Sequence, residues 1–228
     1  YLYAPTVIGS SIAPWKSLLI PTAHDEPVAS LPVFKHLYSR VAGFIYLTEP
    51  EKAYVEKAFS VHGKPHVLLG TGIDLPESTS DISDIRKKYD IDKPFVLYMG
   101  RIETGKGCEE LLRYFQSYRL SRDPGVMLVL AGRLHMPLPD DPAIRYIGFV
   151  PETDIRPLME ASHVIAVPSQ FESLSILLLQ ALACSRPVIA NAKCPVLVHH
   201  CEQSNAGLHY NCESEFVETL DLILHCPN

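Results

Sequence analysis

The sequence predicts an α/β protein whose strands are parallel. Strand-sized apolar runs alternate with helix-sized amphipathic segments, an alternation typical of βαβ units. One segment, Val164–Ala190 (VIAVPSQFESLSILLLQALACSRPVIA), contains a whole unit: a β-branched run, a polar turn, a helix-forming stretch and a second apolar run after Pro187. The composition agrees, because 47% hydrophobic and 20% charged residues are enough to bury a sizeable core.

The first third of the chain alternates in the same way, although Tyr1–Ser11 shows little periodicity. Thr48 is expected to cap a helix, with Pro50 early in that helix and Glu51 three residues after the cap, an arrangement close to a capping box. The other predicted elements are a strand at Ser17–Pro21, a helix at Leu31–Arg40, and strands at Gly43–Leu47 and His66–Leu69.

A polar segment without periodicity, Leu75–Ser83, is the best candidate for a linker. A second α/β set follows it and leads into the unit at Val164–Ala190 and beyond. Its predicted helices are Asp84–Tyr89, Cys108–Tyr118, Thr153–Ala161 and Glu213 to about Leu224, and its strands are Phe95–Met99, Val126–Ala131, Ile144–Ile147 and one near Gly207–His209.

Within Val164–Ala190, the pattern predicts a strand at Val164–Val167 and a helix at Leu174–Cys184. A parallel crossover places the loop between them at the carboxyl edge of the sheet, where open α/β sheets bind ligands. The helix amides freed at Leu174, Ser175 and Ile176 would suit an anion such as a diphosphate, with Glu172 just before them.

This segment resembles the donor-binding signature of the retaining family-4 glycosyltransferases of the GT-B type. The signature residues present are Pro168, Ser169, Glu172, Ala181, Pro187 and Val188. Two positions depart from it: residue 180 is Gln where the family usually has Glu, and residue 185 is Ser where the family prefers Gly. The resemblance implies two Rossmann-like domains with parallel sheets.

The resemblance divides the chain into residues 1–73, the tail of an acceptor domain, and residues 74–228, a donor domain that binds a nucleotide-sugar. Only three strands are predicted before the linker, whereas a doubly wound half has about five or six. We therefore expect the first domain to be incomplete, its N-terminal part missing. The chain by itself is then expected to bind nucleotide weakly and to transfer no sugar.

The loop Gly100–Gly107 (GRIETGKG) follows a strand and precedes a helix. It fits the GxxxxGK of a P-loop, but Gly107 replaces the Ser or Thr that would hold Mg²⁺. The same residues match the Gly-Arg…Lys-Gly pattern of the resembled family. There, Arg101 and Lys106 would grip the diphosphate and offset the charge that grows on it as the glycosidic bond breaks.

His24 comes directly after a predicted strand, in Thr-Ala-His-Asp-Glu. A lone loop histidine is often only a polar surface residue. The resemblance implies instead an active-site histidine that reaches the donor sugar. The neighbouring Asp25 and Glu26 point opposite ways in an extended loop, so joint acid–base action on one bond is not expected.

The resemblance assigns the remaining roles. Glu172 would bond the hydroxyls of the donor sugar, and Gln180 stands where the family binds the ribose diol. The backbone of Arg145–Pro151 would read the nucleobase, which leaves the base unspecified. The residues expected to bind the substrate are Gly100, Gly132, Arg133, Phe149, Val150, Ser173, Leu174, Ser175, Ile176 and Gln180.

No metal and no cofactor is expected, since the nucleotide-sugar is itself a substrate. The C-terminal region holds Cys and His residues, but their spacings follow no structural zinc pattern. These residues are Cys194, His199, His200, Cys201, His209 and Cys212. Part of the region, Ala192–Tyr210, looks like a segment found in a bacterial subset of the resembled enzymes.

The net charge of −6 argues against nucleic acid as a partner. The longest nearly apolar stretch, Leu174–Cys184, is too short to span a bilayer, no signal peptide opens the chain, and the six cysteines are scattered, so a cytoplasmic setting is expected.

The expected activity is transfer of a sugar, with retention of anomeric configuration, from a nucleotide-diphosphate-sugar to an acceptor hydroxyl on a glycan, a lipid or a small molecule. The missing part of the first domain could add peripheral membrane contact. The alternatives are a binding module with a decayed site and another GT-B enzyme such as a sugar-nucleotide epimerase.

Overall fold

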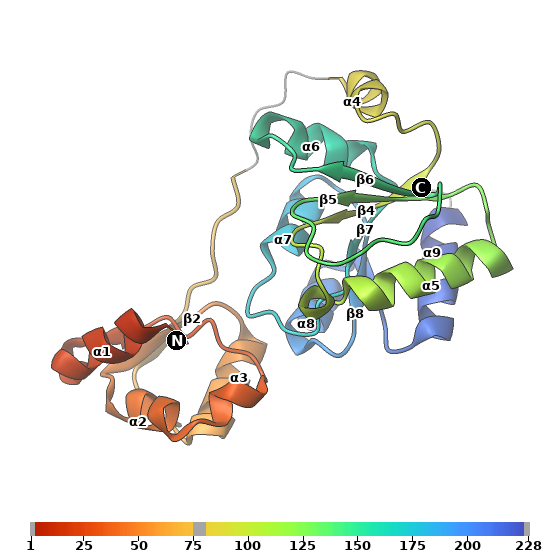
Figure 1. Cartoon of the computed structure of the whole chain (residues 1–228). Coiled ribbons are helices and arrows are strands. Elements are labelled where there is room, and N and C mark those ends of the chain that lie inside the picture. Colours follow the sequence, from red (N-terminus) through yellow and green to blue (C-terminus); the bar gives the residue numbers. More distant parts are fainter. Residues whose placement is uncertain (1–2, 75–80, 226–228) are drawn as a thin grey trace. The chain divides into compact units, whose positions relative to one another are not determined.

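The computed structural model describes residues 3–74 and 81–225 of the chain (Figure 1). Its internal contacts divide it into two compact units. The first unit is Tyr1–Gly72 together with Phe171–Ser175, and the second is Ile73–Gln170 together with Ile176–Asn228. Each unit is built on a sheet whose described strand pairs are all parallel, so the predicted α/β class is confirmed.

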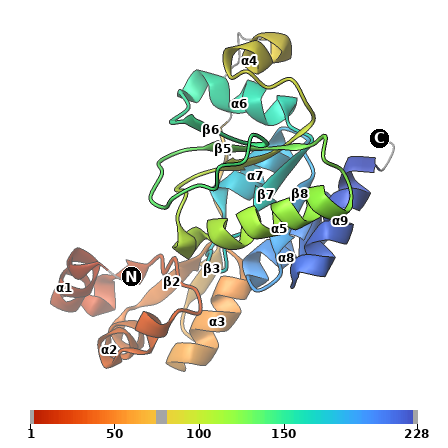
Figure 2. The same cartoon turned by 45° about the vertical axis from the view of Figure 1, so that its right-hand side comes forward.

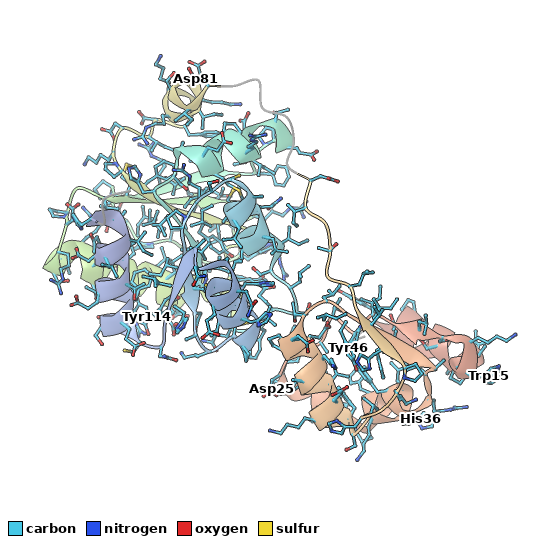
Figure 3. The ribbon with its side chains drawn as sticks, turned by 180° about the vertical axis from the view of Figure 1, so that it is seen from behind. Trp15, Asp25, His36, Tyr46, Asp81 and Tyr114 are labelled. Carbon is cyan, nitrogen blue, oxygen red and sulfur yellow. The ribbon has the colours of Figure 1, made fainter. Side chains whose placement is uncertain are left out.

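The sheet of the first unit has the strand order β1-β2-β3. Its core is aromatic: the ring centroids of Tyr38 and Phe59 are 3.9 Å apart, and Phe44 stacks on Tyr46. In Figure 3, Tyr46 lies inside the unit, whereas Trp15 points outward. The strands are β1 (Leu18–Leu19), β2 (Gly43–Tyr46) and β3 (His66–Leu68), and the helices are α1 (Ala4–Ile12), α2 (Pro32–Arg40) and α3 (Glu49–Phe59), with 3-10 turns at Pro14–Lys16 and Pro27–Ser30.

The sheet of the second unit has the strand order β6-β5-β4-β7-β8-β9. Its strands are β4 (Phe95–Met99), β5 (Met127–Ala131), β6 (Ile144–Gly148), β7 (Val164–Val167), β8 (Val188–Asn191) and β9 (Gly207–Tyr210). Its helices are α4 (Ile82–Lys88), α5 (Cys108–Ser121), α6 (Glu152–Ala161), α7 (Ile176–Ala183), α8 (Pro195–Ser204) and α9 (Glu213–His225), with a 3-10 turn at Thr104–Lys106.

Helices cover both faces of this sheet, as Figure 2 shows. Leu97 of β4 points to the face that packs against α6, α7 and α8, whereas its neighbours Val96 and Tyr98 point to the face covered by α5 and α9. The central strands are therefore buried on both sides, which explains why they are continuous apolar runs in the sequence. No helix in the described ranges combines the length and the apolar character that crossing a bilayer requires.

The predicted linker Leu75–Ser83 is only partly within the described residues, because 75–80 lie outside them. The predicted end of the linker is wrong, because α4 begins at Ile82, inside the predicted linker and two residues before the predicted start of the helix. The end of α4 is fixed to α6 by the buried Asp154 carboxylate, whose Oδ2 lies 2.6 Å from both Lys88 Nζ and Tyr89 Oη. Burial alone would raise the pKa of Asp154, but these two hydrogen bonds hold it below its usual value.

The predicted helix Leu174–Cys184 is wrong at its start. Helix α7 begins at Ile176, because Ser175 has a φ of +65°, in the left-handed region that a right-handed helix cannot contain. Leu174 and Ser175 are therefore buried turn residues, and the amides they were expected to offer do not belong to the first helical turn.

Two helices were not predicted from the sequence. Helix α1 has no buried residue, and two of its apolar side chains, Ile8 and Ile12, are exposed, so its sequence lacks the usual contrast between a buried and a solvent-facing side. Helix α8 begins at Pro195 and ends at Ser204, and its C-cap residue Asn205 has a φ of +52°. A proline at the first helical position and an asparagine at a left-handed C-cap are the local signals that could have revealed it.

Candidate functional site

The centre of the second sheet is a topological switch point. From β4 the chain builds β5 and β6 on one side, and then returns to place β7, β8 and β9 on the other. The loops that follow β4 and β7 therefore leave the sheet at neighbouring positions and diverge, the arrangement that forms ligand sites in open α/β sheets. The Gly100–Gly107 loop follows β4, and Pro168 follows β7.

The start of the loop after β4 is held by backbone bonds. Gly100 N donates to Ala131 O at 2.9 Å, and Ile102 N donates to Arg133 O at 2.8 Å, which extends the pairing of β4 with β5 beyond the strands. The hydroxyl of Tyr98 also donates to Arg101 O at 2.7 Å. The backbone that carries Arg101 is thus fixed before any ligand binds.

The two cations of this loop differ in exposure. The side chain of Arg101 is 61% exposed, and its guanidinium lies 3.2 Å from the Glu103 carboxylate. Such an exposed pair stabilises by only about 0–1 kcal/mol, so Arg101 can turn to an anionic ligand at little cost. Lys106 is half-buried in the 3-10 turn Thr104–Lys106. The predicted corner between strand and helix is confirmed.

Gly107 brings this loop against the end of β7. Its φ is +76°, and it caps α5 at the residue directly after Lys106. A Cβ built on Gly107 would overlap the carbonyl oxygen of Pro168. Only glycine allows this close approach, and the packing joins the two loops at the switch point.

Gly132 directly follows β5, as Gly100 directly follows β4. Its φ is +134°, and a Cβ added there would overlap the carbonyl oxygen of Gly100. Its own carbonyl accepts a hydrogen bond of 3.0 Å from Tyr146 Oη, and its N–H donates to Gly148 O at 2.7 Å. Arg133 follows with an exposed side chain.

The segment after β6 presents one exposed and one buried side chain. Phe149 is 77% exposed, whereas Val150 is 5% exposed and belongs to the hydrophobic core on the α6 side of the sheet. The side chain of Val150 is therefore committed to the core, and this residue can offer a ligand only its backbone.

The residues after Pro168 follow the corrected boundary of α7. Glu172 and Ser173 are half-buried, Leu174 and Ser175 are buried, and Ile176 is exposed at the first position of the helix. Gln180 lies in α7 one turn after Ile176 and is half-buried. The first amides of α7 thus come from Ile176 onward.

His24 lies in the first unit, in the loop after β1. Its side chain is 25% exposed, and its Nδ1 lies 3.5 Å from Glu26 Oε1, beyond a good hydrogen bond. By their contacts, Phe171–Ser175 belong to the same unit, where the ring of Phe171 lies 5.6 Å from the imidazole.

The sequence did not reveal what holds the His24 loop. The Thr48 cap is confirmed, since Thr48 Oγ1 accepts from Glu51 N at 3.2 Å. The buried Glu51 carboxylate, however, accepts from Ala23 N at 2.8 Å and from Leu47 N at 2.7 Å, so it anchors the residue before His24. Burial raises the pKa of Glu51, and these bonds act in the opposite direction.

A second missed residue is Asn191, at the end of β8. It is fully buried, and its amide nitrogen donates to Pro168 O at 3.0 Å and to Glu110 Oε1 at 3.1 Å. Nothing in the sequence pattern of β8 distinguishes this residue from its apolar neighbours except its polarity, which is unusual in a buried strand.

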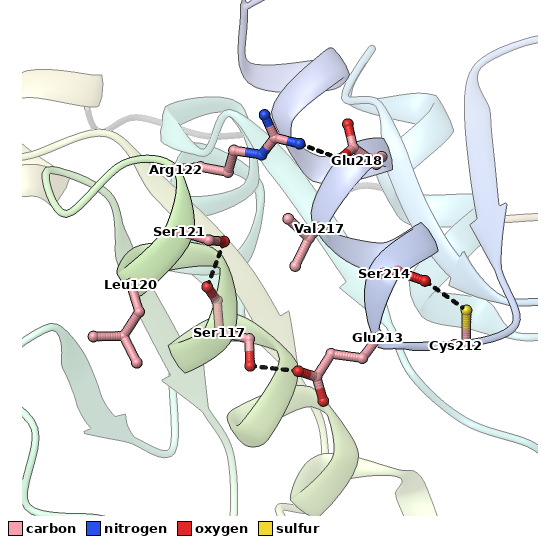
Figure 4. A pocket seen from close by; sticks show the side chains of 9 residues that line it. All are labelled: Ser117, Leu120, Ser121, Arg122, Cys212, Glu213, Ser214, Val217 and Glu218. Carbon is pink, nitrogen blue, oxygen red and sulfur yellow. Dashed lines mark hydrogen bonds and ion pairs between the residues drawn. The ribbon is translucent and has the colours of Figure 1, made fainter.

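The predicted site residues do not lie in the open pocket of about 840 Å³ shown in Figure 4. That pocket lies between α5 and α9, and its lining contains none of the predicted site residues. Within residues 3–74 and 81–225, no group of three His, Cys, Asp or Glu side chains is placed to hold a metal ion. Cys194 and Cys201 are buried thiols.

Comparison with known proteins gives relatives of one kind. The chain is 26% identical over 130 residues to the O-antigen chain mannosyltransferase B of Escherichia coli, which covers 51% of this chain and 34% of that protein. It is 27% identical over 127 residues to the alpha-D-kanosaminyltransferase of Streptomyces kanamyceticus, which covers 48% of this chain and 31% of that one.

A solved structure of Anabaena HepE in complex with UDP-glucose matches with a TM-score of 0.75 and 20% identity, over 96% of this chain and 65% of that one. Of the two curated relatives named above, by contrast, the chain spans only about a third of the length. The parallel sheets and these neighbours show the GT-B fold. The family model for glycosyl transferases group 1 matches residues 81–228, more than half of the chain, and the chain therefore belongs to the glycosyl transferases group 1 family.

Proposed function

We propose that this chain is the donor-binding part of an enzyme that transfers a sugar, with retention of anomeric configuration, from a nucleotide-diphosphate-sugar to an acceptor hydroxyl. One observation supports it above the others: Gly107 packs against the Pro168 carbonyl, so the Arg101–Lys106 loop and the end of β7 meet at the switch point. Family membership points to the same donor class, and so does the UDP-glucose in the complex with HepE.

In this proposal, Arg101 and Lys106 bind the diphosphate. Breaking the bond between the sugar and the diphosphate leaves negative charge on the leaving oxygen, and two cations there stabilise that charge more than they stabilise the intact donor. The first amides of α7, from Ile176 onward, add donors and the positive end of a helix dipole. No metal ion takes part in this proposal.

The transferred sugar is assigned to Glu172 and His24, and the ribose to Gln180. A carboxylate accepts hydrogen bonds from sugar hydroxyls, and the Ala23 N–H bond to Glu51 holds the backbone directly before His24. The base would meet Phe149 and the backbone of Val150, since the side chain of Val150 is buried.

A binding module with a decayed site is the second candidate. Gln180 favours it, because a neutral amide replaces the carboxylate of the resembled family. Ser185 also departs from that family, and its φ of +54° is one that glycine adopts more easily.

Saturation-transfer NMR with UDP, GDP and ADP sugars separates these functions. The proposal expects binding of one nucleotide series, and release of the free nucleoside diphosphate by the full-length protein when an acceptor is present. Binding without any turnover by the full-length protein supports the module, interconversion of free sugar nucleotides supports an epimerase, and absence of binding overturns the donor site altogether.

Replacing Gln180 by Glu should tighten nucleotide binding by about 1 kcal/mol, or roughly fivefold. A carboxylate accepts both ribose hydroxyl protons, in charge-assisted bonds of about 1.5–3 kcal/mol, against about 0.5–1.5 kcal/mol for an amide. Repulsion from the diphosphate and desolvation oppose this gain, but Arg101 and Lys106 make the surroundings positive.

Calorimetric titration with the matching nucleoside diphosphate measures the difference. Gln180→Met, of similar size and without hydrogen-bonding groups, is the control and should bind more weakly than the unchanged chain. If all three proteins bind equally, residue 180 does not hold the ribose.

A further inference from the structure

Asn191 is an isolated amide in an apolar strand, and its surroundings explain its burial. It ends β8, the neighbour of β7 in the sheet, and its exposed fraction is 0%. Its side chain has two protons and one oxygen to satisfy, and each has a partner: Pro168 O, Glu110 Oε1, and the backbone N–H of Lys193, which donates to Asn191 Oδ1 at 3.0 Å. A buried amide with all its hydrogen bonds made is rigid, because any rotation would break them.

These partners lie on three different elements. Pro168 follows β7, Glu110 lies in the first turn of α5, and Lys193 follows β8. Glu110 also forms an ion pair with Lys193 through its other oxygen, at 3.2 Å. The amide of Asn191 therefore ties the start of α5 to the ends of two neighbouring strands.

The Pro168 carbonyl connects Asn191 to the loop that contains Lys106. It accepts the Asn191 proton, and it is also the surface on which the Gly107 backbone rests. Lys106 is the residue directly before Gly107, so the direction of that carbonyl sets where the loop with Lys106 can lie. A carbonyl turned away from Asn191 would press on Gly107 or open a gap beneath it.

We infer that Asn191 is a positioning residue, whose amide fixes the Pro168 carbonyl so that the Gly107 contact holds Lys106 in place for the diphosphate. The inference rests on the proposed function, since it gives Lys106 its ligand. Asn191 itself touches no substrate in this scheme, and it acts only through Pro168 and Gly107.

The test uses one substitution and its partner. Asn191→Asp keeps the size and the oxygen that Lys193 N bonds, but it loses both protons and places a carboxylate beside Pro168 O and Glu110. Adding Glu110→Gln supplies an amide proton for the new carboxylate and removes the repulsion between the two acidic groups, yet it gives nothing back to Pro168 O. Lys193→Ala is the control, because it removes only the exposed ion pair with Glu110.

Two measurements are made on each variant: the thermal midpoint of unfolding, and the Kd for UDP, GDP and ADP by calorimetry below that midpoint. Asn191→Asp should lower the midpoint and weaken binding by roughly fivefold or more, as expected for the loss of a buried hydrogen bond. The double variant should recover much of the midpoint while its Kd stays weak. Lys193→Ala should leave both near the values of the unchanged chain.

A Kd that recovers together with the midpoint in the double variant would mean that Asn191 only stabilises the fold, and the inference would be wrong. Equal binding by Asn191→Asp and the unchanged chain would overturn it as well. Failure of the proposed function is distinct from both: the unchanged chain would then bind none of the three nucleoside diphosphates, and the positioning role would fall with it.

Discussion

Lys106→Ala is expected to abolish sugar transfer and to leave the fold intact. Removing one group that stabilises charge developing in a transition state typically lowers turnover by about 100- to 1,000-fold. Lys106 is half-buried in a 3-10 turn, and a typical point substitution lowers the free energy of unfolding by about 1 kcal/mol, which a folded domain tolerates. The loss of activity should therefore occur without loss of structure.

The measurement is release of nucleoside diphosphate from the donor sugar by the full-length enzyme, together with a thermal melt. Lys87→Ala, which removes an exposed cation from α4, is the matched control and should keep its turnover. Lys106→Arg keeps the charge and should retain part of the activity. Turnover of Lys106→Ala within a few-fold of the unchanged enzyme would show that the diphosphate lies elsewhere.

Gly132→Ala is expected to have the largest effect on stability. Its φ of +134° is a conformation that residues with a side chain rarely adopt, at a cost of about 1–3 kcal/mol. The added Cβ would also overlap the Gly100 carbonyl, and overpacking of this kind costs about 1–3 kcal/mol more. A loss of roughly 2–6 kcal/mol is a large part of the 5–15 kcal/mol that holds a typical domain folded.

Gly105→Ala is the comparison in the same unit. Its nearest outside neighbour, Glu103 Oε1, would be 3.9 Å from the new Cβ, which is ordinary contact. Urea unfolding of both variants should show a marked fall of the midpoint for Gly132→Ala alone. Equal midpoints would mean that the loops after β4 and β5 can separate without cost, contrary to the packing described above.

The central strands of the second unit could be predicted because they are buried on both faces. Phe95–Met99 and Val164–Val167 are found as predicted, since an apolar run between polar turns has few other interpretations. The start of α7 could not be predicted, because Leu174 fits the apolar pattern of the helix. Only the left-handed backbone of Ser175 separates Leu174 from the helix.

The candidate site was predictable where it lies on one continuous segment. The Arg101–Lys106 loop carries its own pattern of residues at a strand-to-helix corner. The bonds from Asn191 to Glu110 and from Glu51 to Ala23 join residues far apart in the sequence, and no local pattern records such a pairing. The polarity of Asn191 within an apolar strand is a signal that could have drawn attention to it, but it does not name the partner.

The strand order β6-β5-β4-β7-β8-β9 also has a consequence for how the chain is made. A ribosome delivers β4, β5 and β6 first, and these three strands can pair with one another while the rest of the chain is still being synthesised. The other edge of β4 has no partner until Val164 has emerged and paired with Val96. Pairing over such a sequence separation is slow and leaves an apolar strand edge open meanwhile. That open edge, beside which the nucleotide is proposed to bind, is therefore a place where the nascent protein can aggregate.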